Sequence, residues 1–183
     1  ILILGLALWW VSHLFKRVAP GARARMGVMP GKMLVTVLSL AALGLMVIGY
    51  RRAGFDPVYT PMAGMGHLNN LLMLIAVFLM GVPHSKGIVK SKLRHPMLTG
   101  VAVWSVGHLL VNGDVASLVL FGGIGIWAVL SMVLINARES WTPPARGRLK
   151  RDVIGLAIAL VVYAVIAGIH IWLGRNPFLG TYG

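Results

Sequence analysis

Residues 97–136 read MLTGVAVWSVGHLLVNGDVASLVLFGGIGIWAVLSMVLIN, and the only charged side chain among them is that of Asp114. The triplet Asn112-Gly113-Asp114 divides this stretch into two apolar runs, 97–111 and 115–136. Apolar runs of this kind cross a hydrocarbon layer of about 30 Å as helices. The stretch therefore predicts two membrane helices joined by a short turn.

The rest of the chain repeats this pattern of apolar runs and short polar connections. Four further apolar runs occur at 1–15, 33–50, 67–82 and 153–173, and the segments between them are rich in Pro, Gly, Lys and Arg. Only 11% of the 183 residues are charged, whereas a water-soluble domain has about 25%. We therefore expect an all-α, polytopic integral membrane protein with six transmembrane helices in a single domain over 1–183. The absence of Cys excludes disulfides, thiolate catalysis and iron–sulfur clusters.

The basic residues indicate the orientation, because Lys and Arg concentrate in cytoplasmic loops. Most of the 17 basic residues lie in the first, third and fifth connections: Lys16, Arg17, Arg23, Arg25, Lys32, Lys86, Lys90, Lys92, Arg94, Arg138, Arg146, Arg148, Lys150 and Arg151. We therefore expect both termini on the outer side, and basic loops that contact lipid headgroups rather than nucleic acid. The chain begins with Ile1, so we expect a few residues before it, and the first run lacks the features of a cleaved signal peptide.

Histidines inside the apolar runs are the strongest candidates for a functional site, because ionisable groups in lipid need a partner or a purpose. His13 and His108 are the two that lie within membrane depth. At about 1.5 Å per residue, both fall near the middle of a layer of about 30 Å. The sequence therefore predicts that two histidines from different helices meet at one depth.

The residues around the two histidines are also alike. Six of the ten positions in 5–14 match those in 100–109, namely the Gly, Ala, Trp, Val, His and Leu positions. Three runs separate the copies, so they would run in opposite directions, as in an inverted 3+3 repeat. The other pairs of runs show no comparable match, so chance similarity of apolar sequence stays open as the alternative.

The Gly, Trp and His of each copy are spaced four apart and therefore share one helix face. These residues are Gly5, Trp9 and His13 in the first copy, and Gly100, Trp104 and His108 in the second. Such a face could form a haem wall, with a glycine that leaves room for the macrocycle and two neutral imidazoles as axial ligands. The alternative is that both histidines only hydrogen-bond to a neighbouring helix.

Other polar residues could support such a site. Haem propionates would need Arg or Lys near a membrane surface, for which Arg17 and Arg94 are candidates, and His95 is either an interfacial cap or a propionate neighbour. His67 and His170 lie toward the outer side and form a candidate second ligand pair, although interhelical hydrogen bonding explains His67 equally well. No residue pattern identifies a catalytic group. Carboxylates are absent from the apolar runs, which argues against a proton pump or a zinc site.

Several segments of the chain resemble one family of bacterial membrane proteins. The segments are Lys92-Leu93-Arg94-His95-Pro96-Met97-Leu98, Gly107-His108-Leu109-Leu110, Asn112-Gly113-Asp114, Leu120-Phe121-Gly122, Ala19-Pro20 and Ile169-His170-Ile171-Trp172-Leu173. Together with the first run around His13, they are similar to the NnrU family over essentially the whole chain.

The resemblance implies a bacterial inner-membrane protein associated with nitrite and nitric oxide respiration. The family shares its membrane domain with plant 15-cis-ζ-carotene isomerase, a haem b protein whose ligating histidines correspond to His13 and His108. A cysteine of that enzyme, proposed as an exchangeable ligand, corresponds to Ser105 here, so a mechanism that needs a thiolate ligand is excluded.

Three functions are therefore open. The chain could be a haem b protein that isomerises an apolar polyene or serves nitrite and nitric oxide respiration. It could instead be a cofactor-free accessory protein that assembles or regulates respiratory membrane enzymes. A small transporter is the third interpretation, and the repeat is its main support.

Overall fold

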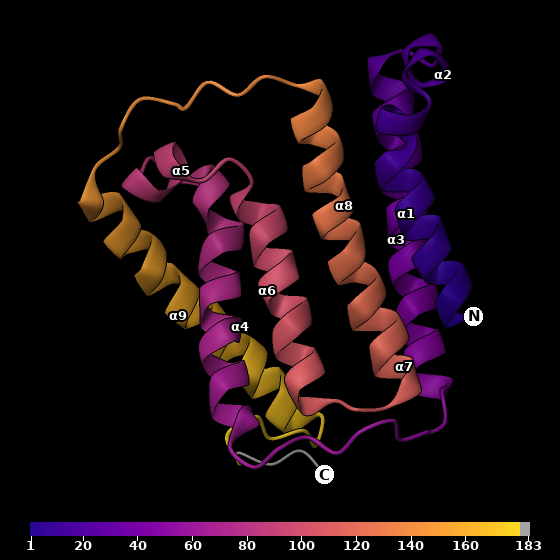
Figure 1. Ribbon diagram of the computed structural model, residues 1–183, viewed down its shortest axis with the longest axis vertical. Coiled ribbons are helices and arrows are strands. Elements are labelled where there is room, and N and C mark those ends of the chain that lie inside the picture. Colours follow the sequence, from indigo (N-terminus) through magenta and orange to yellow (C-terminus); the bar gives the residue numbers. More distant parts are fainter. Residues whose placement is uncertain (180–183) are drawn as a thin grey trace.

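The computed structural model describes residues 1–179 and is built from helices (Figure 1). The helices are α1 (Leu2–Val18), α2 (Pro20–Arg25), α3 (Val28–Arg52), α4 (Met65–Gly81), η1 (Val82–His84), α5 (Ile88–Lys92), α6 (Pro96–Val111), α7 (Val115–Ser117), η2 (Leu118–Gly122), α8 (Gly123–Arg138) and α9 (Leu149–Trp172). Within the described residues the only β pairing is an isolated bridge between Pro57 and Asp114. The predicted all-α fold is confirmed.

Each of the six predicted apolar runs folds as helix. Four helical segments are long and apolar enough to cross a membrane, namely Val28–Arg52, Met65–His84, Val115–Arg138 and Leu149–Trp172. α6 is a shorter apolar helix, and α1 has 17 residues. Helix α3 extends beyond the predicted 33–50 at both ends, because polar and basic residues continue a helix wherever its backbone can pair.

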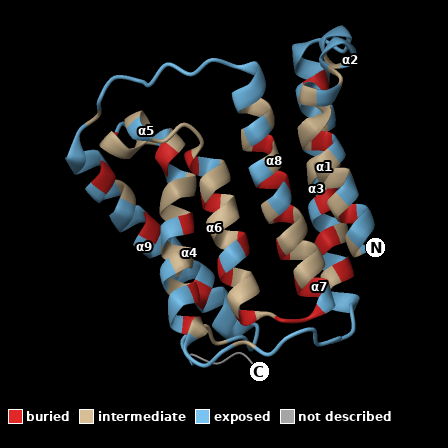
Figure 2. Cartoon of the chain, in the orientation of Figure 1, coloured by how far each residue is buried: buried red, intermediate tan, exposed pale blue. Residues whose placement is uncertain are grey.

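The long helices form two groups that meet at α6 and α8 (Figure 1). In one group α1 lies along α3 and also touches α8, and in the other α4 lies along α6 and α9. The core cluster consists of Ala42, Met46, Ile124, Trp127 and Ala128. Most of α9 is exposed instead (Figure 2). Apart from Lys150, Arg151 and His170, its exposed side chains are apolar, as expected of a helix that faces lipid.

The connections gather at two ends of the molecule, which we call the basic end and the opposite end. The basic end comprises residues 19–27, 82–95 and 139–148, and the last of these segments runs from α8 across to α9 (Figure 1). The opposite end comprises 53–64 and 112–114. The orientation of the helices therefore agrees with the alternation of basic and non-basic connections in the sequence.

Backbone hydrogen bonds fasten the opposite end. The amide of Val58 donates to the carbonyl of Gly113 at 2.7 Å, and the amide of Val115 donates to Asp56 at 2.9 Å. Asp114 is buried, and its carboxylate accepts the Ser117 amide at 2.9 Å and caps the helix that begins there. The phenol of Tyr50 reaches the Ser117 hydroxyl at 2.8 Å. Asp114 is thus part of a buried network and not an exposed loop residue.

Glycines let α1 and α6 approach their neighbours closely. A Cβ added to Gly5 would lie 2.7 Å from the backbone nitrogen of Met46 in α3, and one added to Gly100 would lie 2.9 Å from the carbonyl oxygen of Ala76 in α4. Backbone atoms cannot move aside as a flexible side chain can. Both glycines are therefore needed for helix contact.

We expect Gly5→Ala to lower the free energy of unfolding by about 1–3 kcal/mol, because the added methyl overpacks the contact with α3. Gly44→Ala in α3 is the matched control, since nothing lies within 4 Å of its Cβ position. That control should leave stability unchanged or slightly raise it. Denaturation of the detergent-solubilised variants measures both effects, and equal stability of the two would contradict the packing shown here.

Candidate functional site

His13 lies in an aromatic cluster between α1 and α8. Its ring stacks on Trp9 with centroids 3.9 Å apart and meets Trp127 edge-on at 5.1 Å. Its Nδ1 lies 3.0 Å from the carbonyl oxygen of Trp9 and 3.0 Å from the hydroxyl of Ser12. A carbonyl can only accept, so we assign the proton to Nδ1 and the free lone pair to Nε2. Metal-binding histidines are held in the same way by a carbonyl on the second nitrogen.

His108 lies in a second aromatic cluster between α6 and the start of the long helical segment 115–138. Its ring is parallel to that of Phe121, with centroids 4.3 Å apart, and meets Trp104 edge-on at 4.9 Å. Within the part of the chain that the structure describes, the imidazole makes no hydrogen bond. Neither nitrogen is therefore committed to a protein partner among the described residues.

The two histidines contact one helical segment but at different levels. His13 touches Trp127 and His108 touches Phe121, which are six positions and therefore about 9 Å apart along the helix. The structure records contacts of each ring with this segment and none between the two rings among the described residues, so a shared depth of His13 and His108 stays a prediction.

In the Gly-Trp-His pattern, the glycine has a different role from the predicted one, which was to leave room for a haem. The surface beside Gly5 is covered by α3 and that beside Gly100 by α4, so both glycines lie at helix crossings and not beside an open wall. The rings of Trp9 and Trp104 meet those of Trp127 and Phe121 edge-on. The two copies therefore share one environment, with glycine against a paired helix and the aromatic residues against the segment 115–138.

Two indole groups beside His13 lack an acceptor. The Nε1 atoms of Trp9 and Trp127 are buried and have no hydrogen-bond partner among the described residues. A buried donor without a partner costs about 1–3 kcal/mol, so both donors are available to a ligand with an acceptor atom. The sequence does not indicate the contact of Trp127 with His13, because no spacing relates the two residues.

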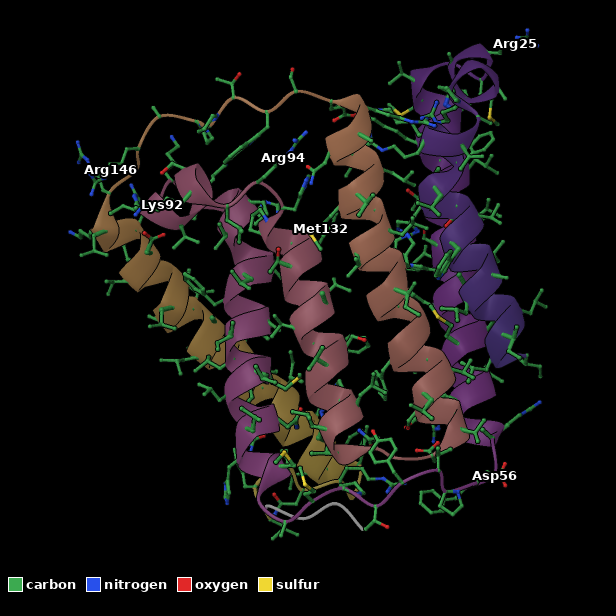
Figure 3. The ribbon with its side chains drawn as sticks, in the orientation of Figure 1. Arg25, Asp56, Lys92, Arg94, Met132 and Arg146 are labelled. Atoms are coloured by element: carbon green, nitrogen blue, oxygen red, sulfur yellow. The ribbon has the colours of Figure 1, made fainter. Side chains whose placement is uncertain are left out.

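Arg94 lies at the basic end (Figure 3), and His95 follows it directly in the 82–95 connection. The imidazole of His95 is 2.8 Å from the side-chain oxygen of Asn136 in α8. Arg94 donates to the backbone carbonyl of Glu139, and Arg17 donates to the Glu139 carboxylate. These contacts join the end of α1, the start of α6 and the end of α8.

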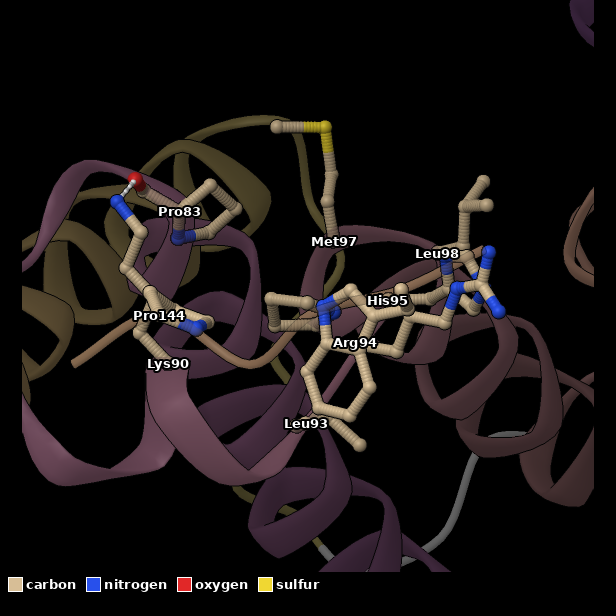
Figure 4. Close-up of a pocket in the computed structure, with 10 residues that line it drawn as sticks. Pro83, Lys90, Leu93, Arg94, His95, Met97, Leu98 and Pro144 are labelled. Atoms are coloured by element: carbon tan, nitrogen blue, oxygen red, sulfur yellow. Dashed lines mark hydrogen bonds between the residues drawn. The ribbon is translucent and has the colours of Figure 1, made fainter. Parts of the chain in front are cut away.

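The same two residues line an open pocket of about 300 Å³ (Figure 4). His95 also precedes the first residue of α6, as an interfacial cap would, but its side chain makes no capping hydrogen bond. The structure thus shows a pocket with basic side chains beside the N-terminal start of α6. Which anion the pocket holds is considered below.

The other two candidate histidines are exposed. His67 lies in the first turn of α4, and His170 is near the end of α9, where its Nδ1 is 2.8 Å from the carbonyl oxygen of Ile166. Among the described residues the two rings make no contact with each other. A ligand pair of His67 and His170 therefore stays a prediction.

The ion pair at the basic end has a defined pH dependence. The Arg17 guanidinium, which donates a hydrogen bond to Glu139, lowers the pKa of that carboxyl. A folded-state pKa below the unfolded value of about 4.3 stabilises the fold above that pH, and the stabilisation disappears as the pH falls through the folded-state pKa.

We therefore expect the melting temperatures of the wild type and Glu139→Gln to converge as the pH falls from about 6 to about 3. The difference at pH 6 should be small and should shrink in salt, because the carboxylate is exposed. Thermal denaturation in detergent measures it. A difference that does not change with pH would show that the carboxylate charge is irrelevant to the contact.

Comparison with known proteins gives one match. A family model described as NnrU protein matches residues 1–177. No curated protein and no solved structure matches the chain. The match covers all of the helices described above.

Proposed function

The chain belongs to the NnrU family, and from this premise we propose that it is a six-span haem b protein of the bacterial inner membrane. In this proposal α1 and α6 cross the bilayer together with the four longer segments. The basic end lies in the cytoplasm, and both termini lie on the periplasmic side. The distribution of basic residues supports this orientation.

The observation that carries the haem proposal is the state of the two core histidines. His13 has its Nδ1 held by a backbone carbonyl, so its Nε2 can bind a metal, and His108 has no hydrogen bond that a metal would have to break. The unpartnered indole donors of Trp9 and Trp127 fit a group that brings acceptor atoms to the His13 cluster. Neutral imidazoles are established haem ligands.

The donor chemistry therefore fits haem b. When bound, haem supplies an iron that can carry electrons, bind a diatomic ligand such as nitric oxide, or act on a polyene that enters from the bilayer. The residues of this chain hold the imidazole orientation, pack the aromatic walls and keep water out. Arg17, one turn beyond His13, and Arg94 with His95 are cations and donors at the end where propionates would meet the interface.

We expect His108→Ala and His13→Ala each to lose most of the haem bound by the wild type. His84→Ala, an exposed histidine at the basic end, is the control and should retain it. The pyridine haemochrome assay on protein purified after expression with haem supply measures the stoichiometry, and size-exclusion chromatography shows whether each variant folds.

His170→Ala distinguishes the ligand partner of His108. If haem is retained in His170→Ala and lost in His13→Ala, the pair is His13 and His108. Loss in His170→Ala with retention in His13→Ala would assign the partner to α9. Full haem in a folded His108→Ala would remove this residue from the ligand set.

A cofactor-free accessory protein for respiratory membrane enzymes is the second candidate function. The observation that favours it is the separation of His13 and His108 along the 115–138 segment, with a core in which Ala42 and Ala128 are 0% exposed. A wild-type protein that folds, stays colourless and cannot be loaded with haem would support this function over the first.

The topology has a separate test, for which the absence of Cys is convenient. Ala24 at the basic end and Thr60 at the opposite end are both exposed. An impermeant maleimide added to intact spheroplasts should label Thr60→Cys, whereas Ala24→Cys should react only after permeabilisation. Labelling of Ala24→Cys from outside would overturn the proposed orientation.

A further inference from the structure

The open pocket at the basic end combines cationic and apolar walls (Figure 4). Its polar side chains are those of Lys90, Arg94 and His95. The remaining lining residues are Pro83, Leu93, Pro96, Met97, Leu98, Trp141 and Pro144. They come from the 82–95 connection, the start of α6 and the 139–148 segment, so three parts of the chain build one pocket. The ligand that fits these walls is an amphiphile with an anionic head.

The positive charge of the pocket is only partly offset by the protein, because the Glu139 carboxylate interacts electrostatically with Arg94 as well as with Arg17. No acidic residue is among those that line it. The nearby carboxylate of Glu139 is bound by Arg17, and that of Asp152 accepts the amide of Ile88 at 2.7 Å. Arg94 and Lys90 donate only to backbone carbonyls, the latter to Pro83 at 2.6 Å. Both cations therefore have donors left for an anion.

The first turn of α6 lies beside the pocket, because Pro96, Met97 and Leu98 are among its lining residues. α6 begins at Pro96, and the residue before it offers no side-chain cap. The amides of Met97 and Leu98 have no hydrogen-bond partner among the described residues, as expected in a first helical turn. Such amides bind anions at the positive end of a helix. These amides would act together with the side chains of Lys90 and Arg94, so recognition of an anion does not depend on the helix end alone.

The position of the pocket selects a lipid over a free ion. α6 enters the apolar layer at Met97, whose side chain is 45% exposed and lies at the pocket wall. An acyl chain could thus continue from the pocket along the helix, while the phosphate stays at the level of Lys90 and Arg94. Trp141 is suited to this level, because indole rings favour the membrane interface.

We propose that this pocket binds the phosphate of an anionic phospholipid, with Arg94 and Lys90 as its cations. The proposal rests on the membrane placement proposed above but not on haem. A chain that fails every haem experiment can still bind the lipid, and His108→Ala protein serves to separate the two. The lipid would join the 82–95 connection, α6 and the 139–148 segment on the cytoplasmic side.

The test is native mass spectrometry of the delipidated full chain in detergent, titrated with phosphatidylglycerol or with phosphatidylcholine of the same acyl chains. We expect the wild type to bind phosphatidylglycerol preferentially. The Lys90→Gln/Arg94→Gln variant should bind it about tenfold or more weakly, because each cation near an anionic headgroup contributes several-fold. Arg25→Gln, an exposed cation at the same end but outside the pocket, should bind as the wild type does.

Three results would overturn the proposal. One is equal weakening by Arg25→Gln, which would indicate general charge attraction. Another is displacement of the lipid by millimolar inorganic phosphate, which would make free phosphate the ligand. The third is displacement of the lipid by haem loading, which would assign the pocket to propionates. Arg94→Gln removes a contact with Glu139, and the double variant could misfold for that reason. In that case Lys90→Gln alone should weaken phosphatidylglycerol binding several-fold.

Discussion

The structure depends on one constraint, which is that polar groups within a hydrocarbon layer have no water to pair with. The helices satisfy this constraint for the backbone, and a few side chains satisfy it for one another, as Asp114 and Ser117 do at the opposite end. Exceptions among the described residues occur beside the two core histidines and also elsewhere in the helices. The indoles of Trp9 and Trp127 have no acceptor beside His13, and the amide oxygens of Asn69 and Asn70 in α4 have no donor. The imidazole of His108 likewise makes no hydrogen bond among the described residues.

The 115–138 segment also joins the two helix groups. It meets α1 on one side and α6 on the other, and its aromatic residues Phe121 and Trp127 touch His108 and His13 in turn. Close packing through Gly5 and Gly100 holds α1 and α6 against α3 and α4. The histidine faces are thereby directed to the one helix that both groups share.

Much of the fold follows from the sequence, because apolar runs and basic connections are local features. Within the described residues, each of the six predicted apolar runs folds as helix, and four of the helical segments are long enough to cross a membrane. Relative depth could not be predicted in the same way. The level of His108 relative to His13 depends on how α1 and α6 are staggered against the 115–138 segment, which is set by packing between helices.

In the candidate site, too, local spacing was predictable from the sequence, whereas contacts between distant segments were not. The shared spacing of Trp9 with His13 and of Trp104 with His108 correctly paired each histidine with an aromatic neighbour. Trp127 could not be found, because its contact with His13 joins positions far apart in the sequence. The role of the glycines could not be predicted from the sequence either, since a haem wall and a helix crossing both require a small residue.

The central claim is that core histidines bind haem b, and the absorption spectrum of the purified wild-type protein tests it most directly. The account predicts sharp reduced α and Soret bands of a low-spin b-type haem after dithionite, at about one haem per chain. A folded protein that is colourless and takes up no haem on reconstitution would contradict it.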